Sequence, residues 1–329
     1  MKENKLIFFK TLAYIISILS LINLINVSAL TNYTFLFLVI DIFLFLFFLH
    51  KKNKIYYIML LAATISQLYF LPAIIPIHKS PTIHTYTEEN HLRVASLNTH
   101  SFSNEKYNTL KDISFLLDYY NIDVVCFQEY REINGQDSLA FANNFSNYPY
   151  HIINNNELSK ARLAIFSKYP LSNISIDGFR FFNNSVISGD IIIGTKKYKI
   201  INTHLQTTGL SLNSIKNNST LSVKRYNTNN SIRKGQIAYI QNIILSSNTP
   251  IVLCGDFNET PTGYCYRTIN RLLKDTFKEK GSSYPNTITS FFNLLRIDYI
   301  FHSKDLKCHY FYIDRHNLSD HRMQITELE

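Results

Sequence analysis

Residues 252–261 read VLCGDFNETP, a short apolar run that ends in glycine, aspartate and asparagine. A short apolar run bounded by turn residues is typical of a buried β-strand. Asp256 and Asn258 follow the run directly, where a rigid element can display polar groups. A single aspartate after a strand is more often a turn or cap residue, so the stretch gains meaning only if other strands end in the same way.

Five further segments end in polar side chains after apolar runs. They are residues 94–100 (VASLNTH), 123–129 (DVVCFQE), 201–205 (INTHL), 296–301 (RIDYIF) and 318–321 (LSDH). Each is weak evidence alone, because a lone histidine or aspartate is usually structural. Their repeated appearance indicates one shared reaction centre at the ends of several strands.

The pattern from Leu92 onward predicts an α+β fold, in which short β-branched runs alternate with turns and a few helical stretches. We expect strands at 92–97, 124–128, 163–167, 174–176, 186–193, 199–203, 251–255, 297–302 and 309–313, and helices at 107–120, 231–246 and 264–271. Residues 207–233 are rich in Asn, Ser, Thr and Lys and are expected to form a long irregular loop over the cleft. Its basic residues either attract an anionic substrate or are simply exposed.

The ordered set of motifs resembles the endonuclease/exonuclease/phosphatase (DNase I-like) superfamily. Residues 255–258 (GDFN) and 319–321 (SDH) are its most specific parts, and residues 164–171 (AIFSKYPL) look like an internal strand and turn of that family. The resemblance covers about residues 92–323. It implies a four-layered α/β/β/α sandwich and a phosphoester hydrolase dependent on Mg²⁺ or Mn²⁺, here of a membrane-anchored bacterial type.

The resemblance also implies roles for five catalytic residues. Asp256 is the candidate base for the attacking water, and Asn258 holds the water or a phosphoryl oxygen. His204 and His321 are expected to donate hydrogen bonds to the phosphoryl group as negative charge develops. Asp298 is expected to accept the other ring proton of His321 and so to keep it charged.

Glu129, Asn98 and Asp320 are the candidate metal ligands, because Mg²⁺ and Mn²⁺ favour oxygen donors. Two positions depart from the family pattern and are assigned to the substrate. His100 stands where some family nucleases have an aspartate, which weakens the case for a DNA-specific site. Arg162 stands where many relatives have glycine, and is either a phosphate clamp or a solvent-facing edge residue.

Three apolar stretches, residues 6–27, 33–49 and 55–77, precede this domain and predict about three transmembrane helices. A cleaved signal peptide would account for the first stretch but not for the other two. Lysines flank the first stretch and fill the turn after the second, so the positive-inside rule places residues 78–329 outside the cytoplasmic membrane. The expected organisation is membrane helices in 1–78, a linker in 79–91 and the catalytic domain in 92–329.

Composition narrows the substrate only slightly. The formal net charge is +9, but part of it comes from the lysines beside the apolar stretches. The four cysteines lack metal-type spacing. Nucleic acid, phospholipid and small phosphoesters all remain candidate substrates, and no protein partner is predicted. The alternative from another class is a membrane-anchored binding or scaffold protein that has lost activity.

Overall fold

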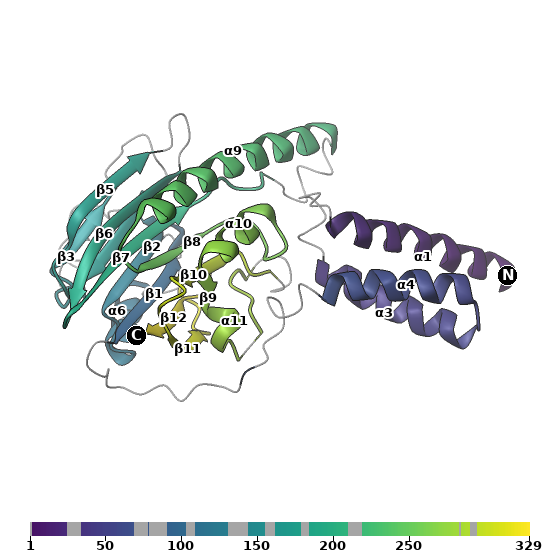
Figure 1. Ribbon diagram of the computed structural model, residues 1–329, viewed down its shortest axis with the longest axis horizontal. Helices are drawn as coiled ribbons and strands as arrows, with labels where there is room; N and C mark the ends of the chain where they lie inside the picture. The colour runs from purple at the N-terminus through teal and green to yellow at the C-terminus, as the bar shows by residue number, and fades with distance from the viewer. Residues whose placement is uncertain are drawn as a thin grey trace.

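The computed structural model describes residues 2–24, 34–68, 78, 91–102, 109–130, 144–154, 162–178, 184–209, 219–282, 284–289 and 295–329. Figure 1 shows a small helical unit at the N-terminal end of the chain and a larger β-rich domain that holds the C-terminus. The predicted boundaries between the apolar segment, the linker and the catalytic domain stay a prediction. Most of the predicted linker, residues 79–90, lies outside the described residues.

The helical unit contains α1 (Lys2–Leu24), α3 (Thr34–His50) and α4 (Lys54–Leu68). Over the part of the chain that the structure describes, no helix is both long enough and apolar enough to cross a membrane. At 1.5 Å per residue, α3 with 17 residues and α4 with 15 fall short of a hydrocarbon layer about 30 Å thick. α1 is longer but begins with Lys2, Glu3 and Lys5. The prediction of three transmembrane helices is not supported by these bounds; residues 25–33 and 69–77, which belong to the same stretches, are outside the described residues.

Two mostly antiparallel sheets form the core of the larger domain. The first has the order β11 (Cys308–Ile313), β12 (Gln324–Leu328), β1 (Leu92–Asn98), β2 (Val124–Tyr130), β4 (Arg162–Ser167) and β3 (Tyr150–Ile153). The second has the order β5 (Ser172–Gly178), β6 (Ser185–Ile193), β7 (Lys196–His204), β8 (Ile251–Asp256), β10 (Asp298–His302) and β9 (Lys274–Asp275). Only the pairs β1–β2 and β7–β8 are parallel among the described strands.

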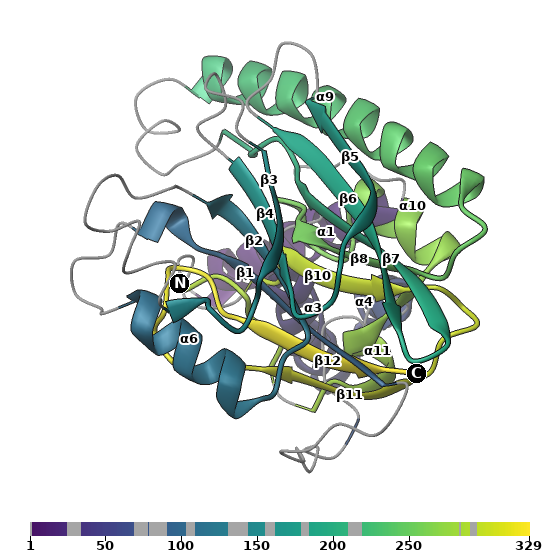
Figure 2. The same cartoon turned by 90° about the vertical axis from the view of Figure 1, so that its left-hand side faces the viewer.

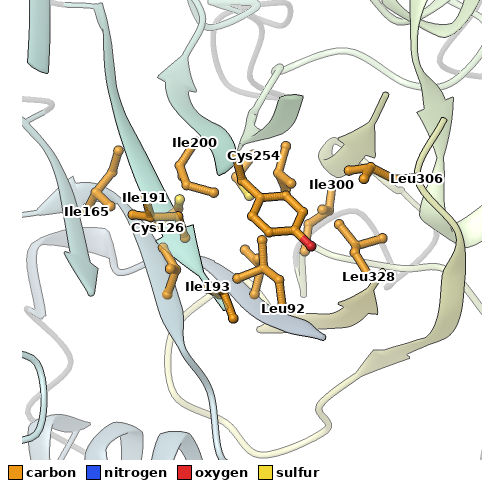
Figure 3. Close-up of a cluster of buried hydrophobic side chains, with 14 of the residues drawn as sticks. Leu92, Cys126, Ile165, Ile191, Ile193, Ile200, Cys254, Ile300, Leu306 and Leu328 are labelled. Atoms are coloured by element: carbon orange, nitrogen blue, oxygen red, sulfur yellow. The ribbon is translucent and has the colours of Figure 1, made fainter. Parts of the chain in front are cut away.

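The facing sides of the two sheets share one apolar layer (Figure 3). Leu92 and Cys126 come from the first sheet, and Ile200, Cys254 and Ile300 come from the second. Buried β-branched and small side chains at alternate positions allow the two sheets to pack closely. Cys126 and Cys254 are free thiols buried in this layer.

Helices cover the outer faces and complete the sandwich (Figure 2). On the first sheet, α6 (Thr109–Tyr119) buries Ile113, Leu116 and Leu117, within the helix predicted at 107–120. On the second, α9 (Ser219–Ser246) and α10 (Tyr264–Leu272) pack through Ile237, Ile240 and Ile269. The remaining short helices are η1 (His100–Phe102) and α11 (Thr276–Lys280). The predicted α+β sandwich of two sheets is confirmed.

The predicted irregular segment 207–233 is wrong over its second half. α9 begins at Ser219 and runs without interruption to Ser246, while residues 210–218 lie outside the described residues. The inward positions of its first turns are polar, namely Ser222, Tyr226, Asn230 and Arg233. No apolar periodicity therefore marked the helix, although these residues repeat at helical spacing. The sequence also failed to predict β3, β9, β12 and α11.

Candidate active site

Most of the candidate residues lie at one end of the sandwich, where strands of both sheets finish. β1 and β2 run parallel, so Asn98 pairs with Gln128 and lies one position from Glu129. β7 and β8 also run parallel, and His204 pairs with Asp256 in register. β10 runs antiparallel to β8, which places Asp298 opposite Asp256 on its other side. Five segments that are distant in the sequence therefore deliver polar groups to one place.

Gly255 explains how β7 and β8 come close enough for this arrangement. A Cβ atom at Gly255 would lie 2.3 Å from the Thr203 carbonyl oxygen, well inside any real contact. Only glycine permits this approach of the two backbones. The glycine of the GDFN motif therefore has a packing role, and it sets the spacing between His204 and Asp256.

Asp256 lies at the centre of the site and is buried. Its Oδ1 accepts the backbone N–H of Asn258 at 2.8 Å, and its Oδ2 accepts Nδ2 of Asn98 at 3.0 Å. Nε2 of His204 and Nε2 of His321 lie 3.6 and 3.9 Å from the same Oδ2. These two distances are too long for direct hydrogen bonds. They are compatible with an oxygen atom of a water or a substrate that contacts both a histidine nitrogen and the Asp256 carboxylate.

His204 faces the site through one ring nitrogen. Nδ2 of Asn258 lies 3.1 Å from Nε2 of His204 and also donates to the Leu205 carbonyl oxygen at 3.0 Å. Asn258 has a positive φ of 50°, a conformation that asparagine tolerates better than most residues. The turn after β8 therefore directs the Asn258 side chain back onto His204.

Asp298 and His321 form a buried charged pair. Nδ1 of His321 lies 2.9 and 3.1 Å from the two carboxylate oxygens of Asp298. Burial alone would lower the pKa of His321, but the charge and hydrogen bond of Asp298, with Asp256 and Asp320, raise that pKa to about 10. Burial raises the pKa of Asp298 to about 6. At neutral pH the pair is therefore a carboxylate and an imidazolium.

Glu129 is held in an unusual backbone conformation, with a φ of 49°. The Thr99 hydroxyl donates to the carbonyl oxygens of Gln128 and Glu129 and fixes this turn. Non-glycine residues with positive φ cluster at functional sites, where the surrounding structure compensates for the strain. The Glu129 side chain is partly exposed, and its Oε1 accepts Nδ2 of Asn98 at 3.2 Å.

The donor set around Glu129 fits a hard divalent cation. Asn98 bridges the carboxylates of Glu129 and Asp256, and among the described residues no lysine or arginine pairs with either. Mg²⁺ commonly binds through one or two carboxylates and keeps several waters. Asn98 presents its amide nitrogen to the carboxylates, because its Oδ1 accepts the His100 N–H at 3.0 Å. Its predicted role as an oxygen ligand would require the amide to turn over.

A second possible ligand group lies in the same site. The ligand atoms of Asp256, Asp298 and His321 are within 4.8 Å of one another. A protonated imidazole, however, offers no lone pair to a metal. Nδ1 of His321 already faces both carboxylate oxygens of Asp298, so two members of this group are paired with each other.

The remaining candidates lie farther out. Nδ1 of His100 is 3.3 Å from Oδ1 of Asp320, and the two side chains are 57% and 41% exposed. The Asp320 backbone is fixed by Thr289, whose N–H donates to the Asp320 carbonyl oxygen at 2.7 Å. Arg162 pairs with Tyr130 in the sheet, one residue beyond Glu129. The substrate role of Arg162 stays a prediction.

Two supporting groups were not predicted. The Thr287 hydroxyl accepts the backbone N–H groups of Ile297 and Asp298 at 3.0 and 3.1 Å, which positions the start of β10. Below the site, Nε2 of Gln128 donates to Oδ1 of Asn202 at 2.7 Å and links the two sheets. The only sequence signal for the second pair was a polar residue inside each of two apolar strands.

This fold and site define a class of two-sheet sandwich proteins with a carboxylate, amide and histidine centre at the strand ends. Residues 95–321 match the Endonuclease/Exonuclease/phosphatase family, and the chain belongs to that family. Members of this DNase I-like family are phosphoester hydrolases that generally depend on a divalent metal. No curated protein matches the chain.

Solved structures agree in fold. The crystal structure of humanized D. rerio TDP2 covers 73% of this chain and 99% of its own, with TM-score 0.57 and 14% identity. An AP endonuclease from Archaeoglobus fulgidus covers 71% and 98%, with TM-score 0.55 and 18% identity. The human Nocturnin catalytic domain covers 74% and 96%, with TM-score 0.53 and 18% identity. At these identities the likeness concerns the fold alone.

Proposed function

We propose that the protein is a Mg²⁺- or Mn²⁺-dependent phosphodiester hydrolase. The observation that carries the proposal is the arrangement around Oδ2 of Asp256, where Asn98, His204 and His321 converge beside the Glu129 carboxylate. Hydrolysis of a phosphodiester needs an oriented water, donors for the phosphoryl oxygens and a counter-charge. Asp256 could orient the water, His204 and His321 could donate to the phosphoryl oxygens, and Glu129 could hold the cation that supplies the counter-charge.

In this mechanism Asp256 orients the attacking water and accepts its proton. Asn98 and the Asn258 N–H hold both Asp256 oxygens, so the carboxylate keeps a fixed direction. His321, kept protonated by Asp298, donates from Nε2 to a phosphoryl oxygen as negative charge develops. His204 on β7 would contribute a second donor if its Nε2 carries a proton, which requires the Asn258 amide, whose nitrogen lies 3.1 Å from Nε2, to turn away.

Glu129, with Asn98 beside it, is the residue we assign to the metal. When bound there, Mg²⁺ supplies charge neutralisation for the phosphoryl group and the leaving oxygen. The partly exposed Glu129 carboxylate leaves space for water ligands, which Mg²⁺ retains. Asp320 and His100 border the same edge of the site and are assigned to metal and substrate contacts respectively.

The test is hydrolysis of a chromogenic phosphodiester by the full chain with and without Mg²⁺. We expect metal-dependent activity that is lost on Asp256→Ala and His321→Ala. A parallel comparison of plasmid DNA, sphingophospholipid vesicles and small phosphomonoesters then assigns the substrate class. If the folded chain hydrolyses none of these substrates, the binding or scaffold alternative replaces the enzyme proposal.

We also propose that the helical unit places the protein in the cytoplasmic membrane, with the catalytic domain on the outer side. The proposal is supported by large apolar side chains on the outward faces of α1, α3 and α4. Phe8 is 62% exposed, Phe43 60% and Ile55 76%. By contrast Asp41 is fully buried and accepts hydrogen bonds from Ser20 and Gln67 at 2.7 and 2.6 Å. Large apolar side chains outside and hydrogen-bonded polar groups inside are typical of helices in lipid.

Fractionation tests this location. We expect the full chain to stay with membranes after an alkaline wash, and external protease to digest the catalytic domain in intact spheroplasts. Phe43→Asp with Ile58→Asp should release it, whereas Ile174→Asp with Ile176→Asp, at exposed positions of β5, should not. Recovery of the unaltered chain in the soluble fraction would contradict the proposal, and protection from protease would reverse the orientation.

A further inference from the structure

Two histidines and a glutamate gather at the end of the sandwich opposite the candidate active site. His91 precedes β1, His309 lies in β11, and Glu329 follows β12. Because β1 separates His91 from Asn98 and each residue advances about 3.3 Å, the cluster lies roughly 20 Å from the catalytic carboxylates. It is therefore a separate feature of the domain.

The ligand atoms of the three residues lie within 4.8 Å of one another. One oxygen, Oε2 of Glu329, is 3.1 Å from Nε2 of His309 and 3.7 Å from Nε2 of His91. In a tetrahedral zinc site with bonds of about 2.0–2.1 Å, neighbouring ligand atoms are about 3.3 Å apart. The two separations from Glu329 lie on either side of that value, and the two imidazole ligand atoms lie within 4.8 Å of each other, so side-chain movements would bring the three groups around one ion.

The second ring nitrogen of His91 is already oriented by a carboxylate. Nδ1 of His91 lies 3.1 Å from Oε1 of Glu327, and Oε2 of Glu327 accepts Nε of the buried Arg93. A histidine that binds a metal almost always donates its other N–H to such a carboxylate, which fixes the tautomer and directs the free nitrogen to the metal. Here that arrangement directs Nε2 of His91 toward Glu329.

The neighbouring groups leave the metal-facing side accessible. The His91 and His309 rings lie side by side, with centroids 4.5 Å apart and planes inclined by 33°. Lys196 approaches the other glutamate oxygen, Oε1, at 3.8 Å and so leaves Oε2 to the two histidines. The side chains of His309 and Glu329 are 25% and 39% exposed, which permits an ion to enter and a water to complete its coordination.

We propose that His91, His309 and Glu329 form a binding site for a zinc-class divalent transition metal. Two imidazoles and one carboxylate suit Zn²⁺, Ni²⁺ or Cu²⁺, whereas Mg²⁺ prefers oxygen donors alone. The bound ion connects the start of β1 with β11 and with the chain after β12. The site does not depend on the proposed hydrolysis, since it shares no residue with the catalytic centre.

Zinc binding to the full chain tests the proposal. Equilibrium dialysis against Zn²⁺ in excess Mg²⁺ counts the zinc ions bound per chain, and excess Mg²⁺ occupies the oxygen-ligand site. We expect His309→Gln and Glu329→Gln each to lower the affinity of the chain for one of its bound zinc ions by at least about tenfold. His151→Gln and His316→Gln replace exposed histidines elsewhere and should bind as much zinc as the unaltered chain.

A second measurement distinguishes loss of the metal site from misfolding of a variant. Co²⁺ bound by two imidazoles and a carboxylate gives visible absorption bands, which the unaltered chain should show and Zn²⁺ should abolish. Thermal unfolding without metal checks that each variant is folded. The proposed site would be wrong if folded Glu329→Gln bound as much zinc as the unaltered chain. It would also be wrong if the unaltered chain gave no cobalt bands that zinc abolishes.

Discussion

Nδ1 of His321 lies 2.9 Å from Oδ2 of Asp298, inside a buried pair at the edge of the candidate active site. The partners come from different places: Asp298 begins β10 and His321 lies after β11. The carboxylate keeps the imidazole charged far above its ordinary range, with a pKa of about 10. A hydrogen-bond donor with a fixed positive charge therefore faces Asp256.

Asp298→Asn is expected to lower the pKa of His321, because the variant removes the negative charge next to the ring. His321 donates as an imidazolium, which is present below its pKa and lost above it. Activity of the unaltered chain should therefore decline only as the pH rises toward about 10, and the variant should decline at a lower pH. At pH 8 we expect kcat/KM to fall by roughly 10²-fold, the order of one lost transition-state donor. The pH profile of kcat/KM measures both effects.

Asp305→Asn is the control for that profile, since Asp305 is exposed in the turn between β10 and β11. It should leave the alkaline limb unchanged. An Asp298→Asn variant with the same alkaline limb as the unaltered chain would show that His321 does not act as a charged donor.

Asp256→Asn should remove hydrolysis while leaving the domain folded. The amide oxygen can still accept the Asn258 N–H, which preserves the turn, but an amide cannot accept a proton from water. General-base catalysis is worth about 10²–10⁴-fold, so kcat should fall within that range with a smaller change in KM. Steady-state kinetics and thermal unfolding, measured together, separate a chemical defect from a folding defect. Retention of more than a tenth of kcat would assign the base elsewhere.

Glu129→Gln should weaken the metal dependence specifically. The substitution keeps the shape of the side chain but removes the carboxylate charge that Mg²⁺ needs. We expect the Mg²⁺ concentration for half-maximal activity to rise by at least about tenfold, with activity partly restored at high Mg²⁺. A titration of activity with Mg²⁺ measures this shift. An unchanged Mg²⁺ requirement would move the metal away from Glu129.

Gly255→Ala should destabilise the domain and reduce activity together. The added Cβ would lie 2.3 Å from the Thr203 carbonyl oxygen, so β7 and β8 must separate and His204 must move relative to Asp256. Overpacking of this kind typically lowers the free energy of unfolding by about 1–3 kcal/mol. Chemical denaturation and kcat/KM report the two effects.

Gly235→Ala is the matched control, because it lies within α9 and a Cβ there meets nothing within 4 Å. Alanine in a helix interior is favoured over glycine by about 0.5–1 kcal/mol, so this variant should gain stability and keep its activity. If Gly255→Ala behaved like Gly235→Ala, the close approach of β7 and β8 would not limit the fold.

The polar residues at the strand ends were predictable because each strand is marked locally by its apolar run. Asp256, Glu129 and His204 all follow such runs, and the structure brings them within a few ångströms of one another. The role of Asn98 was less accessible, since its hydrogen bonds to Glu129 and Asp256 connect two sheets. The substrate role of Arg162 also stays a prediction.

α9 shows why some of the fold could not be predicted. Its inward face is polar at Ser222, Asn230 and Arg233, and Nη1 of Arg233 donates to the Gln206 carbonyl oxygen at 3.0 Å. That partner lies 27 residues away in the sequence, so no local sequence pattern predicts the contact. β12 is similar, because it becomes a strand by pairing with β1 and β11 on its two sides.

The sequence by itself determined the order of strands with polar ends, and hence the family and the candidate reactive groups. It could do so because apolar periodicity and turn residues are local properties of the chain. Only the tertiary structure decided which oxygen faces which nitrogen, that Asn98 turns its nitrogen to the carboxylates, and that His91, His309 and Glu329 meet. Those relationships depend on strand register and sheet packing, which bring together side chains separated by more than 200 residues.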